Sequence, residues 1–277
     1  MTENSFVDEI EKYIASGEIS LPVFNPTALK VQQELVKKEP DSKVLEKLIT
    51  GDQSLASQIL RMANSAFYRG LVEVLSVKAA IVRLGIQEVG RIVLLASSKN
   101  QFNSKDPEIN ELIKKLWQHS VGCGLASHWL ARRCKFEDLL SQAFFVGLFH
   151  DVGKLFVLTV IEQLRNTKNI KMPHALILEA IDTLHARQGY ALMQKWDMPE
   201  QYSLVVRDHH RADFDRKDHL LVMVRLANIV CHKLGISPTQ DQNVNLEATI
   251  EANILELSEI NLAELEIMLE DTRSLFN

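Results

Sequence analysis

The sequence is poor in the residues that form disulfides, flexible linkers and tight turns. Its 277 residues include three cysteines, seven prolines and eleven glycines. Cys123 and Cys134 fall on one expected helix, about 16 Å apart at 1.5 Å per residue, which is too far for a disulfide. Cys231 has no evident partner in the sequence. Since no disulfide framework is expected, a reducing compartment is favoured.

The sequence also lacks alternating apolar and polar strands and the Asn-Gly and Asp-Gly dipeptides of tight hairpins. Its first residues have neither the basic region nor the apolar region of a signal peptide. Only the apolar run 143–161 is long enough to cross a membrane. Crossing would place Asp151 and Lys154 near mid-bilayer, at about 2.5–3.5 kcal/mol each. We therefore expect a soluble, cytoplasmic protein with no membrane partner.

The net charge of −5 is unevenly distributed along the chain. Residues 1–104 carry 12 acidic and 12 basic side chains, and residues 105–241 carry 16 and 18. Residues 242–277 carry 8 acidic side chains and one basic side chain. No basic region is large enough to predict nucleic-acid binding. The acidic excess belongs to the C-terminal segment alone.

What the sequence does contain is helical periodicity throughout, which predicts an all-α protein. A short polar stretch at 103–107 divides it into an N-terminal helical bundle, 1–104, packed on a second bundle, 105–277. Expected helices in the second bundle are 107–134, 138–149, 152–166, 174–182, 185–196, 200–209 and 218–234. Asn261-Leu-Ala-Glu264 resembles a capping box that opens a further helix to about Phe276.

Local signals in the first bundle indicate where its helices begin and end. Asp52 is the expected N-cap of the helix that includes Leu55 to Ala63. Ser76 is the expected N-cap of helix 77–84, and Gly85 is expected to stop that helix in a left-handed conformation. Helix 77–84 and the next helix, from about Gln87, have the outline of a DNA-binding helix-turn-helix. Core packing is favoured because the second helix offers few side chains that could reach base edges.

The most informative stretch is Gly147-Leu-Phe-His-Asp-Val-Gly-Lys154, which places His150, Asp151 and Lys154 in the apolar run. A buried charge is costly without a partner, so these residues require a metal, a ligand or each other. An imidazole beside a carboxylate suits a divalent transition metal. Antiparallel packing of successive helices would allow the histidines on other helices to join this pair.

Several further segments, in order, make the chain similar to a known family. They are Leu21-Pro22, Asn64-Ser-Ala-Phe-Tyr68, Ala80-Ile-Val-Arg-Leu-Gly85, Leu116-Trp-Gln-His-Ser120, Ala143-Phe144, Trp196-Asp-Met-Pro199, His209-His210 and Leu226-Ala-Asn228. Together with the octet, they resemble the HDOD family, a signalling-associated relative of the HD-domain metal phosphohydrolases. The resemblance implies an HD-like helical bundle over residues 105–277.

The resemblance also implies a metal site. In catalytic HD-domain proteins a helix histidine, a His-Asp doublet and a downstream Asp hold the metal. These correspond here to His119, His150 and Asp151, with Asn228 at the position of the last Asp. Two-metal relatives that cleave cyclic dinucleotides add histidines that correspond to His185, His209 and His210. Lys154 falls where such relatives have a phosphate-contacting lysine.

Two departures bear on activity. Asn228 supplies a neutral amide oxygen, which is a poorer ligand than a carboxylate. The Gly-Tyr-Pro segment of the cyclic-dinucleotide enzymes is replaced after His210 by Arg-Ala-Asp-Phe. Many HDOD relatives are thought to have lost catalysis and to act as scaffolds or regulators. Asn228 in place of the last Asp likewise favours a scaffold or regulator over an enzyme.

Each candidate residue also has a simpler interpretation. His119 could be a core histidine with a satisfied nitrogen, and Lys154 an ordinary lysine whose stem lies along apolar surface. Of the adjacent pair, His209 is expected more than His210 to face solvent or cap a helix end. The remaining histidines are expected at the surface: His128, His174, His219 and His232.

The resulting expectation is an HDOD-type signalling or regulatory protein with a vestigial or weakly active metal site. It would hold one or two divalent ions of iron, manganese or zinc and act through signalling proteins, with a nucleotide as a further candidate ligand. The acidic helix near 261–276 is one candidate contact. The alternative is an active metal-dependent phosphohydrolase or phosphodiesterase on a nucleotide or cyclic dinucleotide, with Asp151 and Lys154 catalytic.

Overall fold

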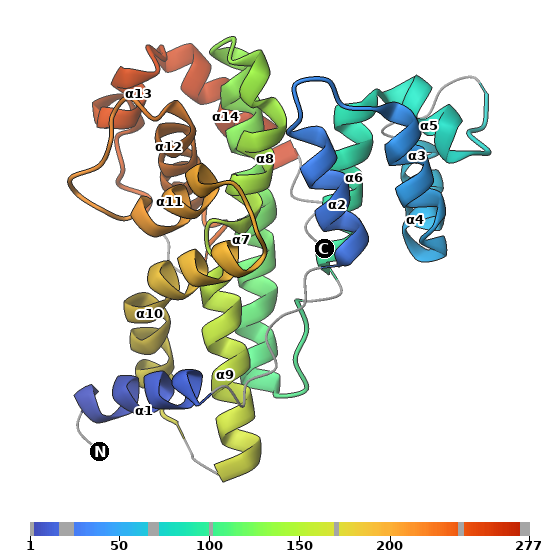
Figure 1. Ribbon diagram of the computed structural model, residues 1–277. Helices are drawn as coiled ribbons and strands as arrows, with labels where there is room; N and C mark the ends of the chain where they lie inside the picture. Colours follow the sequence, from blue (N-terminus) through green and yellow to red (C-terminus); the bar gives the residue numbers. More distant parts are fainter. Residues whose placement is uncertain are drawn as a thin grey trace. The chain divides into compact units, whose positions relative to one another are not determined.

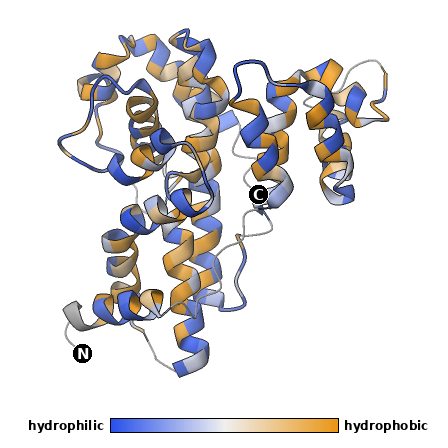
Figure 2. Cartoon of the chain, viewed as in Figure 1, coloured by the Kyte–Doolittle hydropathy of each residue, from blue (hydrophilic) through white to orange (hydrophobic). Residues whose placement is uncertain are grey.

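The computed structural model describes residues 3–16, 25–65, 72–99, 102–168, 172–237 and 241–271. These residues form α-helices α1 to α14 and two short 3-10 helices, with no strand among them (Figure 1). The all-α prediction is confirmed. Apolar and polar residues alternate along the helices as amphipathic periodicity predicts (Figure 2). Leu21-Pro22 and residues 66–68 of the family segments lie outside the described residues.

The chain divides into two compact units. The smaller is Val23–Gln101, and the larger combines Met1–Pro22 with Phe102–Asn277. The division at 101/102 lies close to the boundary expected near residue 104. The expected and observed divisions differ at the N-terminus, because helix α1 (Glu3–Ala15) contacts α9 and α10 of the larger unit.

The smaller unit contains five helices among its described residues: α2 (Pro26–Leu35), α3 (Ser42–Thr50), α4 (Gln53–Ala63), α5 (Val77–Leu84) and α6 (Ile86–Lys99). Asp52 and Ser76 are the N-caps of α4 and α5, as predicted, and accept hydrogen bonds from backbone N–H groups of the first turns. Gly85 ends α5 with φ 84° and ψ 157°. The positive φ was predicted, but ψ is extended rather than left-handed helical.

Helix α6 lies in the core of the smaller unit. Val89 and Val93 are fully buried, and Ile92 is nearly so. Leu35 of α2 packs directly against Gly90. A Cβ added to Gly90 would lie 2.1 Å from a methyl carbon of Leu35. This arrangement matches the core-packing interpretation of the segment after Gly85.

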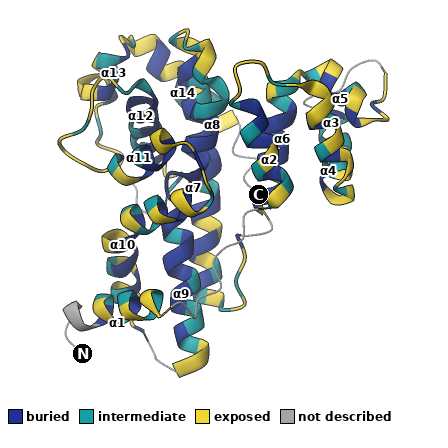
Figure 3. Ribbon diagram, viewed as in Figure 1, coloured by how far each residue is buried: buried dark blue, intermediate teal, exposed yellow. Residues whose placement is uncertain are grey.

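The larger unit contains α1, α7 (Pro107–Arg133), η1 (Glu137–Leu139), α8 (Leu140–Phe149), α9 (Val152–Lys168), α10 (His174–Lys195), α11 (Glu200–Asp208), α12 (His219–Lys233), η2 (Leu246–Ala248), α13 (Ile250–Ile254) and α14 (Glu259–Asp271). Buried residues run along α7 and α9 (Figure 3). Helix α9 contacts both α7 and α10, and α8 packs along α7.

Two predicted elements of this unit are corrected. The helices expected at 174–182 and 185–196 are one continuous helix, α10, because no proline or glycine separates them. The capping box begins at Ser258 rather than Asn261. Ser258 Oγ accepts from Asn261 N, and Asn261 Oδ1 accepts from Ser258 N, each at 3.3 Å. Helix α14 therefore starts at Glu259, and residues 272–276 lie outside the described part.

The apolar run forms the core of this unit. Glu137–Lys168 is long and apolar enough to cross a membrane, yet 89% of its apolar window is buried inside the protein. A core helix of a soluble protein has the same character, and the finding is compatible with the expected soluble protein. The burial also sets the environment of His150 and Asp151, which lie between α8 and α9.

Candidate metal centre

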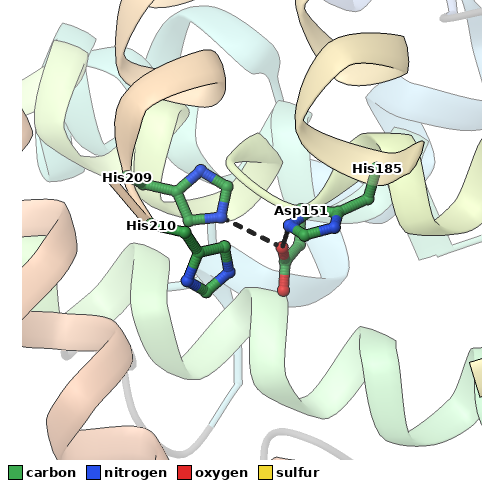
Figure 4. Close-up of side chains that lie close together, drawn as sticks. All are labelled: Asp151, His185, His209 and His210. Carbon is green, nitrogen blue, oxygen red and sulfur yellow. Dashed lines mark ion pairs between the residues drawn. The ribbon is translucent and has the colours of Figure 1, made fainter. Parts of the chain in front are cut away.

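Five structural elements of the larger unit bring the candidate side chains together. His119 comes from the middle of α7, and His150 and Asp151 lie at the junction of α8 and α9. His185 comes from α10, and His209 is the C-cap of α11. All five side chains are buried, with exposures of 0–4%. Figure 4 shows His185, His209 and His210 gathered around Asp151.

The carboxylate of Asp151 is the common neighbour of these histidines. Its Oδ1 lies 3.4 Å from His209 Nε2 and 3.6 Å from His185 Nε2. Its Oδ2 lies 3.4 Å from the Nε2 atoms of both His119 and His150. Two ligand atoms bound about 2.0–2.1 Å from one tetrahedral ion are roughly 3.4 Å apart. The spacing fits ligands arranged around a cation.

The other nitrogen of each of these rings points away from the centre toward a backbone carbonyl. Nδ1 of His119 donates to Ile236 O, and Nδ1 of His150 donates to Gly147 O. Nδ1 of His185 donates to Ile181 O, and Nδ1 of His209 donates to Val206 O. All four distances are 2.8–2.9 Å. A carbonyl oxygen only accepts, so each Nδ1 carries the hydrogen. A ring that is neutral with its hydrogen on Nδ1 directs the Nε2 lone pair at Asp151, as metal-binding histidines direct theirs at the ion.

Several of the converging atoms lack hydrogen bonds. Among the described residues, Nε2 of His150, His185 and His209 is buried with no hydrogen-bond partner. Oδ1 of Asn228, on α12, is also buried without one. A buried polar atom without a partner costs about 1–3 kcal/mol. Three imidazole lone pairs facing one carboxylate are a donor set suited to a divalent transition metal. The residues present therefore fit such an ion.

Electrostatics favours the ligand forms of these groups. Burial lowers the pKa of His150 well below its usual value, and burial likewise lowers the pKa of His185. Burial alone would raise the pKa of Asp151. The ammonium of Lys154 and the imidazole of His150 outweigh it and hold the pKa well below the usual range. Near pH 7 the rings of His150 and His185 are therefore neutral and the carboxylate of Asp151 is ionised.

Glycines allow the helices around the centre to approach closely. A Cβ on Gly153 would lie 1.9 Å from the carbonyl oxygen of His185 and 2.7 Å from the backbone nitrogen of Gly189. A Cβ on Gly189 would lie 2.7 Å from a methyl carbon of Val206. The missing side chains let α9 contact α10 at the turn that carries His185.

The structure separates the roles of the adjacent histidines. His209 is the helix cap that the sequence suggested, but its ring is 2% exposed and faces Asp151, so the expectation that it faces solvent was wrong. His210 is the exposed member, with its ring centroid 4.1 Å from that of His209. Partial burial of the ring and the neighbouring His209 lower the pKa of His210 to about 3.

Lys154 and Asn228 also lie inside the larger unit. Lys154 Nζ is 2.8 Å from Asp151 Oδ2 and its side chain is 14% exposed, so it is not an ordinary surface lysine. Asn228 of α12 is 7% exposed. It precedes His232 by one helical turn, and the His232 ring lies 5.3 Å from that of His119, between centroids. His232 is half-buried, less exposed than the surface position expected for it.

Sequence reasoning missed two thiols. Cys123 and Cys231 are fully buried, and their sulfurs lie within 4.8 Å of each other and of a His119 nitrogen. The i, i+4 spacing of His119 and Cys123 on one helix was a signal for the first of them. Only the packing of α12 on α7 brings Cys231 to the same place.

The all-helical fold of this chain recurs in solved structures. The chain has a TM-score of 0.76 and 19% identity to an HDOD domain protein of unknown function from Geobacter sulfurreducens, covering 99% of this chain and 96% of that one. It has a TM-score of 0.75 and 18% identity to a provisionally named metal-dependent phosphohydrolase from Shewanella amazonensis SB2B, with 99% of each chain covered. These likenesses show the shared fold.

The chain belongs to the HDOD domain family, whose model matches residues 21–212. It is 24% identical to an uncharacterized protein of Treponema pallidum over 78% of this chain. It is 28% identical to the cyclic di-GMP phosphodiesterase CdgJ of Vibrio cholerae over 52% of this chain. The aligned regions are 43% and 33% of those two proteins, so the chain matches less than half the length of either.

Proposed function

We propose that this HDOD protein is a cytoplasmic regulatory protein whose Asp151 centre binds one divalent transition metal and serves signalling rather than turnover. The observation that carries the proposal is the charge of the centre. Among the described residues, Asp151 is the only carboxylate in the clusters of possible metal ligands at this centre. The ammonium of Lys154, 2.8 Å away, cancels its charge.

This charge balance disfavours hydrolysis by two ions. Two-metal phosphohydrolysis places two divalent cations about 3.5–4 Å apart. One carboxylate paired with a lysine leaves four positive charges uncompensated in a buried site, and such burial of unpaired charge is strongly unfavourable. Asn228 adds an oxygen but no charge. A single ion held by Asp151, His185, His209 and His210 needs far less compensation.

Each residue then has a specific part in holding the site. His185 and His209 present Nε2 lone pairs to the ion, and their Nδ1 bonds to backbone carbonyls hold the rings in place. Asp151 supplies the charged ligand, and His150 faces its other oxygen. A bound transition metal supplies Lewis acidity and a fixed link between α9, α10 and α11. The regulatory role follows from that link, because metal binding stabilises one arrangement of these helices.

Signalling-protein partners belong to this proposal. Helix α14 carries Ile260 and Ile267, which are 69% and 57% exposed and seven residues apart, so they lie on one face. Helix α14 belongs to segment 242–277, which carries 8 acidic groups and one basic group. A basic amphipathic helix of a partner is the complementary ligand.

Metal analysis of the 277-residue protein, purified without chelator, tests the Asp151 centre. We expect iron, manganese or zinc in that centre. His185→Ala should weaken its binding about 10-fold or more, because it removes a ligand. His174→Ala is the matched control, since His174 is exposed and pairs with Glu108 instead. A metal-free wild type, or equal binding in both variants, contradicts the proposal.

A second candidate function, hydrolysis of a phosphodiester, is favoured by one observation. His210 is exposed beside the buried ligands, so a substrate phosphate has one polar group through which to approach. The relative CdgJ is named as a cyclic di-GMP phosphodiesterase. In this function Lys154 would leave Asp151 to neutralise charge on the phosphate.

Turnover assays separate the two functions. Cyclic di-GMP, other cyclic nucleotides and nucleoside triphosphates are incubated with metal-loaded wild type and with Asp151→Asn. The regulatory proposal predicts no turnover that depends on Asp151. Turnover in the wild type that disappears in Asp151→Asn would replace it with the enzymatic function.

A further inference from the structure

A second group of metal-binding side chains lies beside the Asp151 centre. It consists of His119 and Cys123, one turn apart on α7, and Cys231 on α12. One ligand atom from each lies within 4.8 Å of those of the other two, and all three residues are fully buried. We call these residues the thiol cluster. His119 also forms a group with His150 and Asp151, so the thiol cluster and the Asp151 centre meet at this histidine.

The orientation of His119 places its Nε2 near both the Asp151 carboxylate and this cluster. Its Nδ1 donates to Ile236 O at 2.9 Å, so Nε2 carries the lone pair. Nε2 lies 3.6 Å from Cys123 Sγ. A nitrogen about 2.05 Å and a sulfur about 2.3 Å from a tetrahedral zinc are roughly 3.5 Å apart. The pair already has the spacing of two zinc ligands.

From this geometry we propose that His119, Cys123 and Cys231 form a second, thiolate-containing site for zinc or a similarly thiophilic divalent ion. Two thiolates and one imidazole are a known zinc donor set, with the fourth position left to water or another group. Asp151 Oδ2, 3.4 Å from His119 Nε2, is a candidate for that position. One nitrogen lone pair binds one ion, so His119 belongs to the thiol cluster whenever that cluster is loaded.

The charges of the two sites support this division. The Asp151 centre has no net negative charge once Lys154 is counted. Two thiolates supply two negative charges, enough to balance one divalent ion. Asn228 lies one turn before Cys231 on α12, so this helix presents a thiol near the place where the family resemblance puts a carboxylate. Soft sulfur ligands select zinc over manganese or magnesium.

The ordinary alternative is that the two cysteines are inert core residues. Burial raises the pKa of the Cys123 thiol well above its usual value, so without a cation it is protonated. Zinc binding must then displace that proton. Inert thiols would bind no ion, whereas ligand thiols would change the absorption spectrum of a bound ion, and this difference is measurable.

Cobalt(II) added to the reduced, metal-free protein is the test, because cobalt bound to thiolates has a charge-transfer absorption in the near ultraviolet. We expect this absorption in the wild type, and zinc should abolish it by displacing the cobalt. Cys231→Ser should lose most of the absorption. Cys134→Ser is the matched control and should keep it, since Cys134 lies at the end of α7 outside the cluster.

The outcomes distinguish this proposal from the proposed function. His185→Ala should keep the thiolate absorption while losing metal at the Asp151 centre, and Cys231→Ser should do the reverse. Cobalt bound without the thiolate absorption, or no cobalt bound by the folded wild type, overturns the thiol site. The wild-type spectrum needs no variant, so the test holds even if Cys231→Ser fails to fold. A Cys231→Ser variant that folds and keeps the absorption also refutes it.

Discussion

At the scale of single residues, the centre depends on how few charges it contains. Asp151 is 1% exposed, and every other group that approaches its carboxylate is a histidine or Lys154. Arginine is absent from those contacts, and so is a second carboxylate among the described groups. The affinity of the site should therefore respond strongly to one added negative charge.

Asn228→Asp tests that response. If Asn228 lies at the ion, the new carboxylate should tighten metal binding about 10-fold, or about 1.4 kcal/mol, because it replaces a neutral ligand. The metal-free variant should be less stable than wild type, since the buried charge then has no partner. Chelator competition measures the affinity, and urea unfolding in chelator measures the stability. Equal affinities for wild type, Asn228→Asp and Asn228→Ala would remove Asn228 from the site.

A second residue-scale prediction concerns Arg165, which joins α9 to the start of α7. Its guanidinium bonds to Asp106 and Glu108, each at 2.7 Å. Burial alone would raise the pKa of Asp106, but Arg165 lowers it; the pKa of Glu108 is lowered by Arg165 first and by His174 second. Groups with lowered pKa values stabilise the fold above their usual pKa and lose that contribution as pH falls.

Arg165→Met should therefore cost about 1–2 kcal/mol near pH 7. The difference in unfolding free energy between Arg165→Met and wild type should shrink below about pH 4. There Asp106 and Glu108 become protonated in the folded and in the unfolded protein. Urea unfolding at several pH values measures it. Arg207→Met is the comparison and should cost less, because Arg207 is 42% exposed where it pairs with Asp208. A cost that is independent of pH would mean that Arg165 acts through packing alone.

The sequence predicted which residues form the centre better than how they face. His119, His150, Asp151 and His185 meet as the family pattern implies. His209 caps α11 as the sequence suggested, but its ring faces Asp151 rather than solvent, and His210 is the exposed member of the pair. Cys231 and His232 were missed since neither has a nearby sequence signal. Their proximity to His119 exists only after α12 packs on α7.

At the scale of elements, the centre depends on the contact between α9 and α10. The sequence predicted each helix from its apolar periodicity, but it predicted a break in α10 that the structure lacks. Periodicity cannot measure how closely two helices approach. That distance is set here by Gly153 and Gly189, which occur on facing turns.

Gly153→Ala is the test at this scale. Its Cβ would meet the His185 carbonyl, so the helices must separate, at a cost of about 3 kcal/mol or more in unfolding free energy. His185 should shift with α10, and metal affinity at the Asp151 centre should fall as well. Gly51→Ala is the control, because its Cβ would meet only the carbonyls of its own helix, at 3.3 Å and beyond. Unchanged stability in Gly153→Ala would show that α9 and α10 are not held this closely in solution.

At the scale of the whole molecule, α1 is the part that sequence reasoning assigned to the wrong neighbours. Its amphipathic pattern predicts that one face is buried, but such a pattern does not say against what. The structure buries Phe6 and Ile10 in the larger unit, where Glu9 pairs with Lys168 and Glu11 with Arg187. The helix content and the break near residue 101, by contrast, follow from local composition.

Ile10→Ala should reveal which unit α1 stabilises. Ile10 is fully buried, and its truncation should cost about 2–4 kcal/mol. Hydrogen exchange measured by mass spectrometry should become faster in α9 and α10, while α3 and α4 of the smaller unit keep their protection. Faster exchange confined to the smaller unit would contradict the observed packing. Val44→Ala is a comparison at a 38% exposed position of the smaller unit, where little change is expected.

The discontinuous larger unit has a consequence for synthesis on the ribosome. Helix α1 is made first, but its contacts in α10 follow more than 160 residues later, after the whole of the smaller unit. At about 5–20 residues per second, α1 waits roughly 10–30 s for its binding surface. The smaller unit has its complete sequence during that interval and can fold first. Until α9 and α10 emerge, the apolar side chains of Phe6 and Ile10 lack the surface that buries them in the folded protein.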